Sequence, residues 1–195
     1  MLENKRVVKP QKDVKEVMNA ITIYNNLEGL KSTDEKSFLK AHKILLSNLI
    51  KDSGKYRKQG VGIVKGSKIE HLPPPALNVP FLMKDLFDYL KNTDEIELIK
   101  SCVFHYEMEF IHPFLDGNGR MGRLWQTLIR LEKYPVFEYL PFETLISKNQ
   151  EKYYEALSKS DKLGKSTTFI EYMLGTIDSS IAELLNFNNR LLSEK

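Results

Sequence analysis

Two amphipathic helical patterns, joined by a short glycine-rich turn, constrain this chain more than any other feature of its sequence. The turn is residues 112–123, which read HPFLDGNGRMGR. Pro113 disfavours helical backbone angles at His112, so we expect the first helix to end there. Apolar residues recur on both sides at three- and four-residue steps, which predicts a helix on each side; those of the first helix are Ile96, Ile99, Val103, Tyr106 and Phe110.

The turn has the features of an anion-binding site. Gly117 and Gly119 allow backbone angles closed to other residues, and with Asn118 they can direct N–H groups toward one point where a helix begins. Arg120 and Arg123 lie three residues apart, on one face of the first helical turn. Cations there oppose the helix dipole, and a polyphosphate between them and the N–H groups would resolve this conflict.

The same segment holds a candidate metal ligand and a candidate base. Asp116 stands at the lip of the turn, where its carboxylate can hold the Mg²⁺ that accompanies a polyphosphate. His112, with an ordinary pKa of about 6.5, is the nearby group that can accept a proton near neutrality. A calcium-binding loop is rejected, because Thr127 stands where its acidic last ligand would be.

Residues 112–123 resemble the signature of the Fic family, His-Pro-Phe-x-Asp/Glu-Gly-Asn-Gly-Arg-x-x-Arg, with every defining position filled. The resemblance implies that His112 is the general base, that Asp116 is the Mg²⁺ ligand and that Arg123 pairs with the γ-phosphate. The phosphate-binding residues that it implies are Gly117, Asn118, Gly119, Arg120 and Arg123. The implied activity is AMPylation: a Ser, Thr or Tyr hydroxyl of a target protein, or of the enzyme itself, attacks the α-phosphorus of ATP and pyrophosphate leaves.

Several other functions stay open. The same site could remove AMP, transfer another nucleotide or phosphocholine, or belong to a catalytically silent nucleotide-binding regulatory module. The Doc-type kinase branch is disfavoured, because it departs from the Gly-Asn-Gly-Arg sequence that is intact here. Nucleic-acid binding is disfavoured too, because the net charge of +3 comes from 29 basic and 26 acidic residues spread along the chain.

The expected fold is all-α, a Fic-type helical bundle with one short β-hairpin. The length of 195 residues and 42% hydrophobic content favour a single domain over 1–195, with its core at about 11–186. A capping-box pattern of Ser32 and Glu35 predicts the start of the second helix. Valine and isoleucine among glycines predict the hairpin over about 56–72. In the Fic family this hairpin is a flap that holds an extended segment of the target by strand addition, and the residues that would do so here are Gly60, Val61, Gly62 and Ile63.

The resemblance also implies an adenine pocket and raises the question of an inhibitory helix. A predicted helix over 147–158 would wall the adenine pocket, with Asn149, Tyr153 and Tyr154 as candidates, although aromatic residues at helical spacing are often core. Glu3 and Asn4 resemble the end of the inhibitory Ser/Thr-x-x-x-Glu-Gly/Asn motif, as in the subgroup with an N-terminal inhibitory helix. The Ser or Thr of that motif would precede Met1, so we expect an active, uninhibited core.

The remaining candidates are given structural roles. His42 is expected to have a packing or surface role, and His105 and Glu109 to form a salt-bridged or solvated pair without metal. Cys102 is predicted to be a buried thiol, which fits the cytoplasm. No apolar run approaches membrane-spanning length. The oligomeric state is left open.

Overall fold

The chain is mainly helical, as predicted. The structure, a computed structural model, describes residues 11–65, 68–140 and 146–193. Its α-helices are α1 (Gln11–Tyr24), α2 (Glu35–Leu45), α3 (Val79–Asn92), α4 (Glu97–Ile111), α5 (Asn118–Leu131), α7 (Gln150–Leu163) and α8 (Thr167–Ser193). Short 3-10 helices cover Leu27–Gly29 (η1), Ala76–Asn78 (η2) and Pro135–Tyr139 (η3). None of the helices in these residues has the length and apolar character needed to cross a lipid bilayer.

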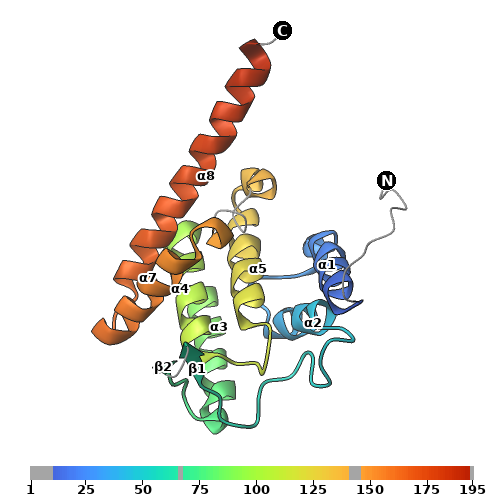
Figure 1. Cartoon of the computed structure of the whole chain (residues 1–195), viewed down its shortest axis with the longest axis vertical. Coiled ribbons are helices and arrows are strands. Elements are labelled where there is room, and N and C mark those ends of the chain that lie inside the picture. Colours follow the sequence, from blue (N-terminus) through green and yellow to red (C-terminus); the bar gives the residue numbers. More distant parts are fainter. Residues whose placement is uncertain (1–10, 66–67, 141–145, 194–195) are drawn as a thin grey trace.

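Helices α4 and α5 lie side by side in the middle of the molecule. Figure 1 shows α1 and α2 on one side of this pair and α7 and α8 on the other. Because α4 contacts α3, α5 and α8, it is buried on most of its sides rather than along one stripe. The sequence predicts a single apolar face for α4. That prediction is wrong at both ends of the helix, because Ile96, directly before α4, is 54% exposed and Phe110 is 37% exposed.

Aromatic side chains fill the core beneath the loop between α4 and α5. The ring of Phe38 on α2 meets Phe87, Phe104 and Trp125 edge-on, with ring centroids 5.5, 5.9 and 5.0 Å away. Edge-to-face contacts of this kind add about 0.5–1.5 kcal/mol each to the free energy gained from burial. They join α2, α3, α4 and α5 into one support for the loop between α4 and α5.

A second apolar cluster holds α7 and α8 against α4. Phe169 and Met173 of α8 are fully buried there, together with Tyr153 of α7 and Cys102 of α4. Burial raises the pKa of the Cys102 thiol to about 11, so the predicted buried thiol is confirmed. The cluster places one face of α7 close to the end of α4.

The predicted capping box at the start of α2 is wrong. The N-cap is Asp34, whose carboxylate accepts the backbone N–H groups of Lys36 and Ser37. Ser32 is instead bound to Glu132 at the end of α5, through both its N–H at 2.8 Å and its hydroxyl at 2.6 Å. The local pattern could not show this, because Glu132 is far away in the sequence.

Two short antiparallel strands, β1 (Ile63–Lys65) and β2 (Lys68–His71), lie within the stretch predicted as a hairpin. They pair in the register Ile63 with His71, Val64 with Ile69 and Lys65 with Lys68. The strands are shorter than the range 56–72 expected from the sequence, and residues 60–62 come before β1. Of the residues expected to hold a target, only Ile63 is in a strand.

Candidate active site at the loop between α4 and α5

The loop turns sharply because two of its residues have left-handed backbone angles. His112 ends α4 with φ 50°, and Gly117 precedes α5 with φ 85°. A side chain at position 117 would be strained by this angle, and its Cβ would lie 2.7 Å from a methyl carbon of Leu46. Glycine is therefore required there, and it allows the N-terminus of α5 to face the loop.

The side chain of Asn118 closes the loop. Its Oδ1 accepts the N–H of Phe114 and its Nδ2 donates to the carbonyl of the same residue, both at 2.9 Å. Asn118 is 2% exposed, so its amide is occupied by the protein. In the phosphate cradle predicted from the sequence, this residue can offer only its backbone N–H.

His42 supports the loop from beneath. Its ring stacks on Phe114, with centroids 3.6 Å apart and planes at 6°. Its Nδ1 accepts the N–H of Gly54 at 2.7 Å, so its Nε2 carries the proton and donates to the carbonyl of Asp116 at 3.0 Å. Burial lowers the pKa of His42, which keeps the ring neutral. Of the two predicted roles, packing or surface, His42 has the packing role, and the part of the molecule that it supports is the loop.

Arg57 fixes the end of α4, although no local pattern in the sequence marks it as important. Its guanidinium donates to the carbonyls of His112 at 2.8 Å, Ile111 at 3.2 Å, Pro74 at 2.6 Å and Gln59 at 3.0 Å. Its backbone N–H donates to the carbonyl of Pro113 at 2.9 Å. Arg57 is 3% exposed. It joins the segment that leads into β1 to the residues around His112.

His112 is half-buried at the mouth of the loop. Its Nδ1 is buried and has no hydrogen-bond partner among the described residues. Burial lowers the pKa of His112 to about 4, and the positive charges of His71 and Arg57 act in the same direction. The ring is therefore neutral near pH 7 and can accept a proton.

Asp116 and Arg120 form an exposed pair at the start of α5. Asp116 Oδ1 accepts the N–H of Gly117 at 2.6 Å and lies 3.1 Å from Arg120 Nη2. Arg120 also bonds through Nη1 to Glu16 of α1, at 3.1 Å. The sequence did not predict this second partner, because α1 is remote from the loop in the chain.

Arg123 lines a cleft of about 220 Å³ between α5 and the start of α7. Tyr153 and Tyr154, both predicted for an adenine pocket, line the same cleft. The hydroxyl of Tyr153 points away from solvent, 3.0 Å from His105 Nε2, while Tyr154 is 46% exposed. Asn149 instead lines a separate groove between α7 and α8.

His105 and Glu109 are buried behind the loop, so the expectation of a salt-bridged or solvated pair is wrong. His105 Nδ1 donates to Gln126 Oε1 at 2.6 Å. Because burial keeps the ring neutral, its Nε2 accepts the hydroxyl hydrogen of Tyr153 at 3.0 Å. Burial lowers the pKa of His105 to about 3 and raises that of Glu109 to about 7. Glu109 Oε1 lies 3.9 Å from His105 Nε2 and has no hydrogen-bond partner in the described part of the chain.

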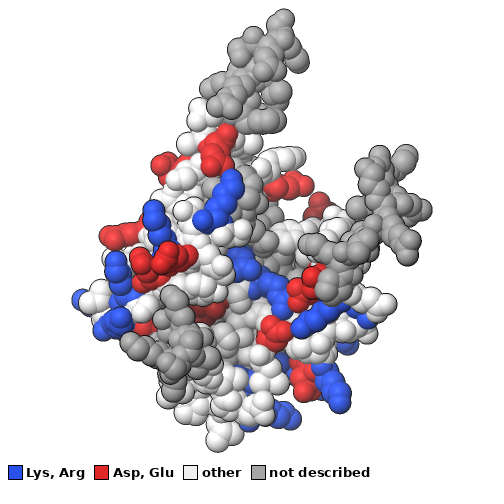
Figure 2. All heavy atoms as spheres, viewed as in Figure 1, with Lys and Arg blue, Asp and Glu red and all other residues white. Residues whose placement is uncertain are grey.

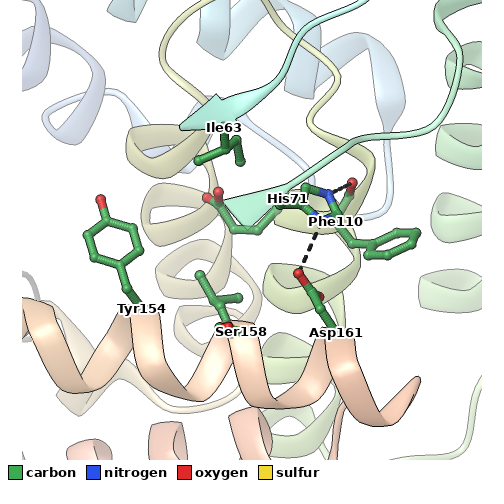
Figure 3. Close-up of a pocket in the computed structure, with 8 residues that line it drawn as sticks. Ile63, His71, Phe110, Tyr154, Ser158 and Asp161 are labelled. Atoms are coloured by element: carbon green, nitrogen blue, oxygen red, sulfur yellow. Dashed lines mark hydrogen bonds and ion pairs between the residues drawn. The ribbon is translucent and has the colours of Figure 1, made fainter. Parts of the chain in front are cut away.

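A small cavity of about 60 Å³ separates the hairpin from α7 and the end of α4. Figure 3 shows Tyr154, Ser158 and Asp161 on one face of α7, opposite Ile63 and His71 of the strands. No group of three or more acidic, histidine or cysteine side chains in the described residues could hold a metal ion by itself.

Basic and acidic side chains are interspersed on the face of the molecule shown in Figure 2. This face has no continuous basic surface of the kind that binds a nucleic-acid backbone. The residues expected from the signature, His112, Asp116, Gly117, Asn118, Gly119, Arg120 and Arg123, come together at one loop. Glu3 and Asn4 lie outside the described residues.

Comparisons with known proteins agree with this geometry. The Fic/DOC family model matches residues 32–129, which run from just before α2 into α5 and include the whole loop. A probable protein adenylyltransferase of Aquifex aeolicus is 35% identical over 108 residues, covering 55% of this chain and 31% of that protein. The protein adenylyltransferase fic-1 of Caenorhabditis elegans is 33% identical over 104 residues, 51% of this chain and 19% of that protein.

Solved structures show the same fold. A Fic family protein from Desulfovibrio desulfuricans superposes with a TM-score of 0.91 and 45% identity, covering 96% of this chain and 57% of that one. BepC of Bartonella tribocorum, solved with bound AMPPNP, has a TM-score of 0.64 at 14% identity, covering 84% of this chain and 82% of that one, and so shares the fold alone. The chain spans less than a third of both curated relatives above. By its signature loop, its fold and the family match, the chain belongs to the Fic/DOC family.

Proposed function

We propose that this chain is a protein adenylyltransferase that transfers AMP from ATP to a Ser, Thr or Tyr hydroxyl of a protein. The observation that carries the proposal is the loop itself: a neutral histidine, a carboxylate, a helix N-terminus and an arginine-lined cleft lie together between α4 and α5. The names of relatives from Aquifex aeolicus and Caenorhabditis elegans support the same activity.

His112 is the proposed general base. The hydroxyl oxygen of the target attacks the α-phosphorus of ATP, its proton passes to the neutral imidazole, and the bond to pyrophosphate breaks. A pKa of about 4 provides the neutral form, and the negative charge of bound phosphates raises the pKa toward the working pH. A positioned base of this kind accelerates a reaction by about 10²–10⁴-fold.

The N-terminus of α5 and Arg123 are the proposed phosphate site. The N–H groups of residues 118–120, in the first turn of α5, have no acceptor within the helix and carry the positive end of its dipole. Arg123 lies in the cleft next to them, and its charge also acts on the buried carboxylate of Glu109. This cleft is the proposed place of the nucleotide, with Tyr153 and Tyr154 in its wall.

Asp116 fits Mg²⁺ only together with a phosphate ligand. Its Oδ1 is occupied by Gly117 and Arg120, while no hydrogen bond or ion pair of its Oδ2 is found among the described residues. Mg²⁺ is typically held by one or two carboxylates plus substrate phosphates and water, and one exposed carboxylate beside a phosphate site suits that pattern. Asp116 would hold such an ion together with the phosphates, and the chemistry it would supply is neutralisation of phosphate charge.

The hairpin is the proposed holder of the target protein. In the described residues β1 and β2 pair only with each other, so an outer edge is open to strand addition. Binding through main-chain groups suits an extended segment that presents its hydroxyl to His112. The same edge can hold another copy of this chain, which makes self-AMPylation an expected side reaction.

Labelled ATP tests the proposal directly. Protein incubated with Mg²⁺, a cell lysate and ATP labelled on the α-phosphate should retain label, whereas ATP labelled on the γ-phosphate should leave none. His112→Ala should lose the α-label. Retention of γ-label would mean a kinase, and no label from either position would favour the AMP-removing or silent readings. Glu3→Gly, in the same assay, should change nothing in an uninhibited core.

A further inference from the structure

The imidazole of His71 ties the end of β2 to two helices. Its Nδ1 lies 3.0 Å from Oδ2 of Asp161 on α7, and its Nε2 lies 2.8 Å from the carbonyl oxygen of Phe110 on α4 (Figure 3). The His71 side chain is 12% exposed.

Both ring nitrogens of His71 face acceptors. A carbonyl oxygen and a carboxylate have no hydrogen to give, so each nitrogen has to donate, and only the imidazolium has two N–H groups. The other oxygen of Asp161 accepts the hydroxyl of Tyr106 at 3.0 Å, so both oxygens of this carboxylate act as acceptors. The geometry therefore requires a positively charged His71.

The groups around His71 fit that charge. On α7 the facing group is Asp161, and on α4 it is the buried Glu109. Glu107 of α4 interacts with Asp161, and His112 is neutral. The hydrogen bond to Asp161 raises the pKa of His71, while burial opposes the increase.

The position of His71 in the hairpin gives the ion pair its importance. His71 is the last residue of β2 and pairs with Ile63, the first residue of β1, so the two residues set where the ribbon begins. A two-stranded ribbon of this size is marginal by itself in water. Its place beside the active loop must come from contacts with the helices.

We propose that His71, as an imidazolium held between Asp161 and the Phe110 carbonyl, is a positioning residue that docks the hairpin beside the active loop. Loss of its proton removes one donor and the ion pair, and the hairpin detaches from α7. The inference rests on the proposed function only for its catalytic consequence, which is weaker target modification at higher pH. Docking itself is measurable without ATP or a target.

The first experiment follows docking on the free protein. Side-chain NMR gives the titration midpoint of His71, and hydrogen exchange gives protection factors for the amides of β1 and β2, corrected for intrinsic exchange at each pH. We expect protection to fall with the same midpoint as the ring. Asp161→Asn keeps an acceptor but removes the charge, so both midpoints should move to lower pH by about one pH unit or more.

Two matched variants separate this role from general damage. Asp88→Asn removes a carboxylate from an exposed pair with Lys84 on α3 and should leave both midpoints in place. Tyr106→Phe removes a hydrogen bond to Asp161 but leaves the Asp161 carboxylate in place. The titration midpoint of His71 should therefore not fall. Hairpin protection that is indifferent to the protonation of His71, or a His71 that is neutral at pH 6, would overturn the proposal.

The second experiment measures transfer of α-label into lysate proteins over the same pH series. Labelling should decrease as the pH rises above the titration midpoint of His71. In Asp161→Asn this decrease should begin at a lower pH. The cause should be a higher KM for the protein target, with the KM for ATP unchanged. A docking transition without label at any pH would count against the adenylyltransferase assignment and leave the docking inference standing. Label that is transferred equally across the docking transition would refute the positioning role.

Discussion

At the scale of single residues, the glycine at position 122 is required by its neighbours. A Cβ there would lie 2.7 Å from His105 Cδ2 and 2.9 Å from Glu109 Oε1, inside a buried and closely packed group. We expect Gly122→Ala to lower the free energy of unfolding by about 1–3 kcal/mol, the usual effect of overpacking a core. Urea unfolding measures the change.

The matched control is Gly175→Ala in α8. A Cβ at this position meets nothing within 4 Å, and alanine favours the helix by roughly 0.5–1 kcal/mol over glycine. Gly175→Ala should therefore stabilise the protein slightly. If both variants lost the same unfolding free energy, the close contacts around position 122 would not be the cause of the loss in Gly122→Ala.

How far the site can be predicted depends on where the partners of each residue lie. His112, Asp116 and Arg123 fall within one short segment, so their spacing is visible in the sequence. Arg57 and His71 act through partners that are remote in the chain, at the end of α4 and on α7. Only the fold brings these groups together, and no local pattern marks them.

At the scale of elements, Arg57 connects the stem of the hairpin to the end of α4. Replacing it with methionine leaves four carbonyl groups without their donor, and we expect a loss of roughly 3 kcal/mol or more in unfolding free energy. Arg57→Lys keeps the charge and part of the bonding, so it should lose less. Thermal and urea unfolding give the comparison.

Lys58→Met is the control for Arg57→Met. Lys58 is the neighbouring residue and is exposed, so the same change of charge and shape should alter stability by no more than about 0.5 kcal/mol. A similar loss in both variants would mean that the charge of this segment, rather than the carbonyl bonds of Arg57, stabilises the loop.

Helix α1 contacts the first turn of α5 through the ion pair of Glu16 with Arg120. If Arg120 binds phosphate, Glu16 competes with ATP for it. Exposed pairs of this kind contribute about 0.2–1 kcal/mol, so Glu16→Gln should tighten ATP binding by up to about fivefold. Calorimetric titration of ATP measures the effect, and Glu28→Gln, an exposed carboxylate in η1, serves as the control. Weaker ATP binding in Glu16→Gln would show that Glu16 orients Arg120 instead of competing.

The elements themselves were largely predictable, while their ends and faces were not. Pro113 and the periodic apolar residues on both sides of the turn predict the junction at His112, where α4 ends. The start of α2 was assigned to Ser32, which contacts Glu132 instead, and α4 was given one apolar face although it is surrounded. Periodicity reports the environment of a surface helix, so it fails for a central one.

For the whole molecule, buried histidines make stability depend on pH. Burial lowers the pKa of His42, that of His105 to about 3 and that of His112 to about 4. In the unfolded chain these groups take up protons below about pH 6.5. Their contribution to stability is therefore present above pH 6.5 and lost as the pH falls through the folded values. Glu109, with its pKa raised to about 7, offsets about one of the three protons.

Unfolding free energy should consequently fall between pH 6 and pH 5, by up to about 3 kcal/mol per pH unit for a net uptake of two protons. His71 has a raised pKa, so its effect on the free energy of unfolding has the opposite pH dependence. Its contribution is fully present below about pH 6.5 and is lost as the pH rises above that value. Urea titrations at intervals of half a pH unit measure the slope. Stability that is flat or increasing from pH 6 to pH 5 would contradict the buried neutral state of these rings.

If β1 holds the target protein, as proposed above, its short length limits which proteins can be bound. Three residues, Ile63–Lys65, offer an edge of about 10 Å, at roughly 3.3 Å per strand residue. A target can pair with such an edge only where a few of its own residues leave their native hydrogen bonds. Modification would then follow the local unfolding of the target, and among proteins with equal numbers of hydroxyl groups, those with mobile loops and fraying ends would react first.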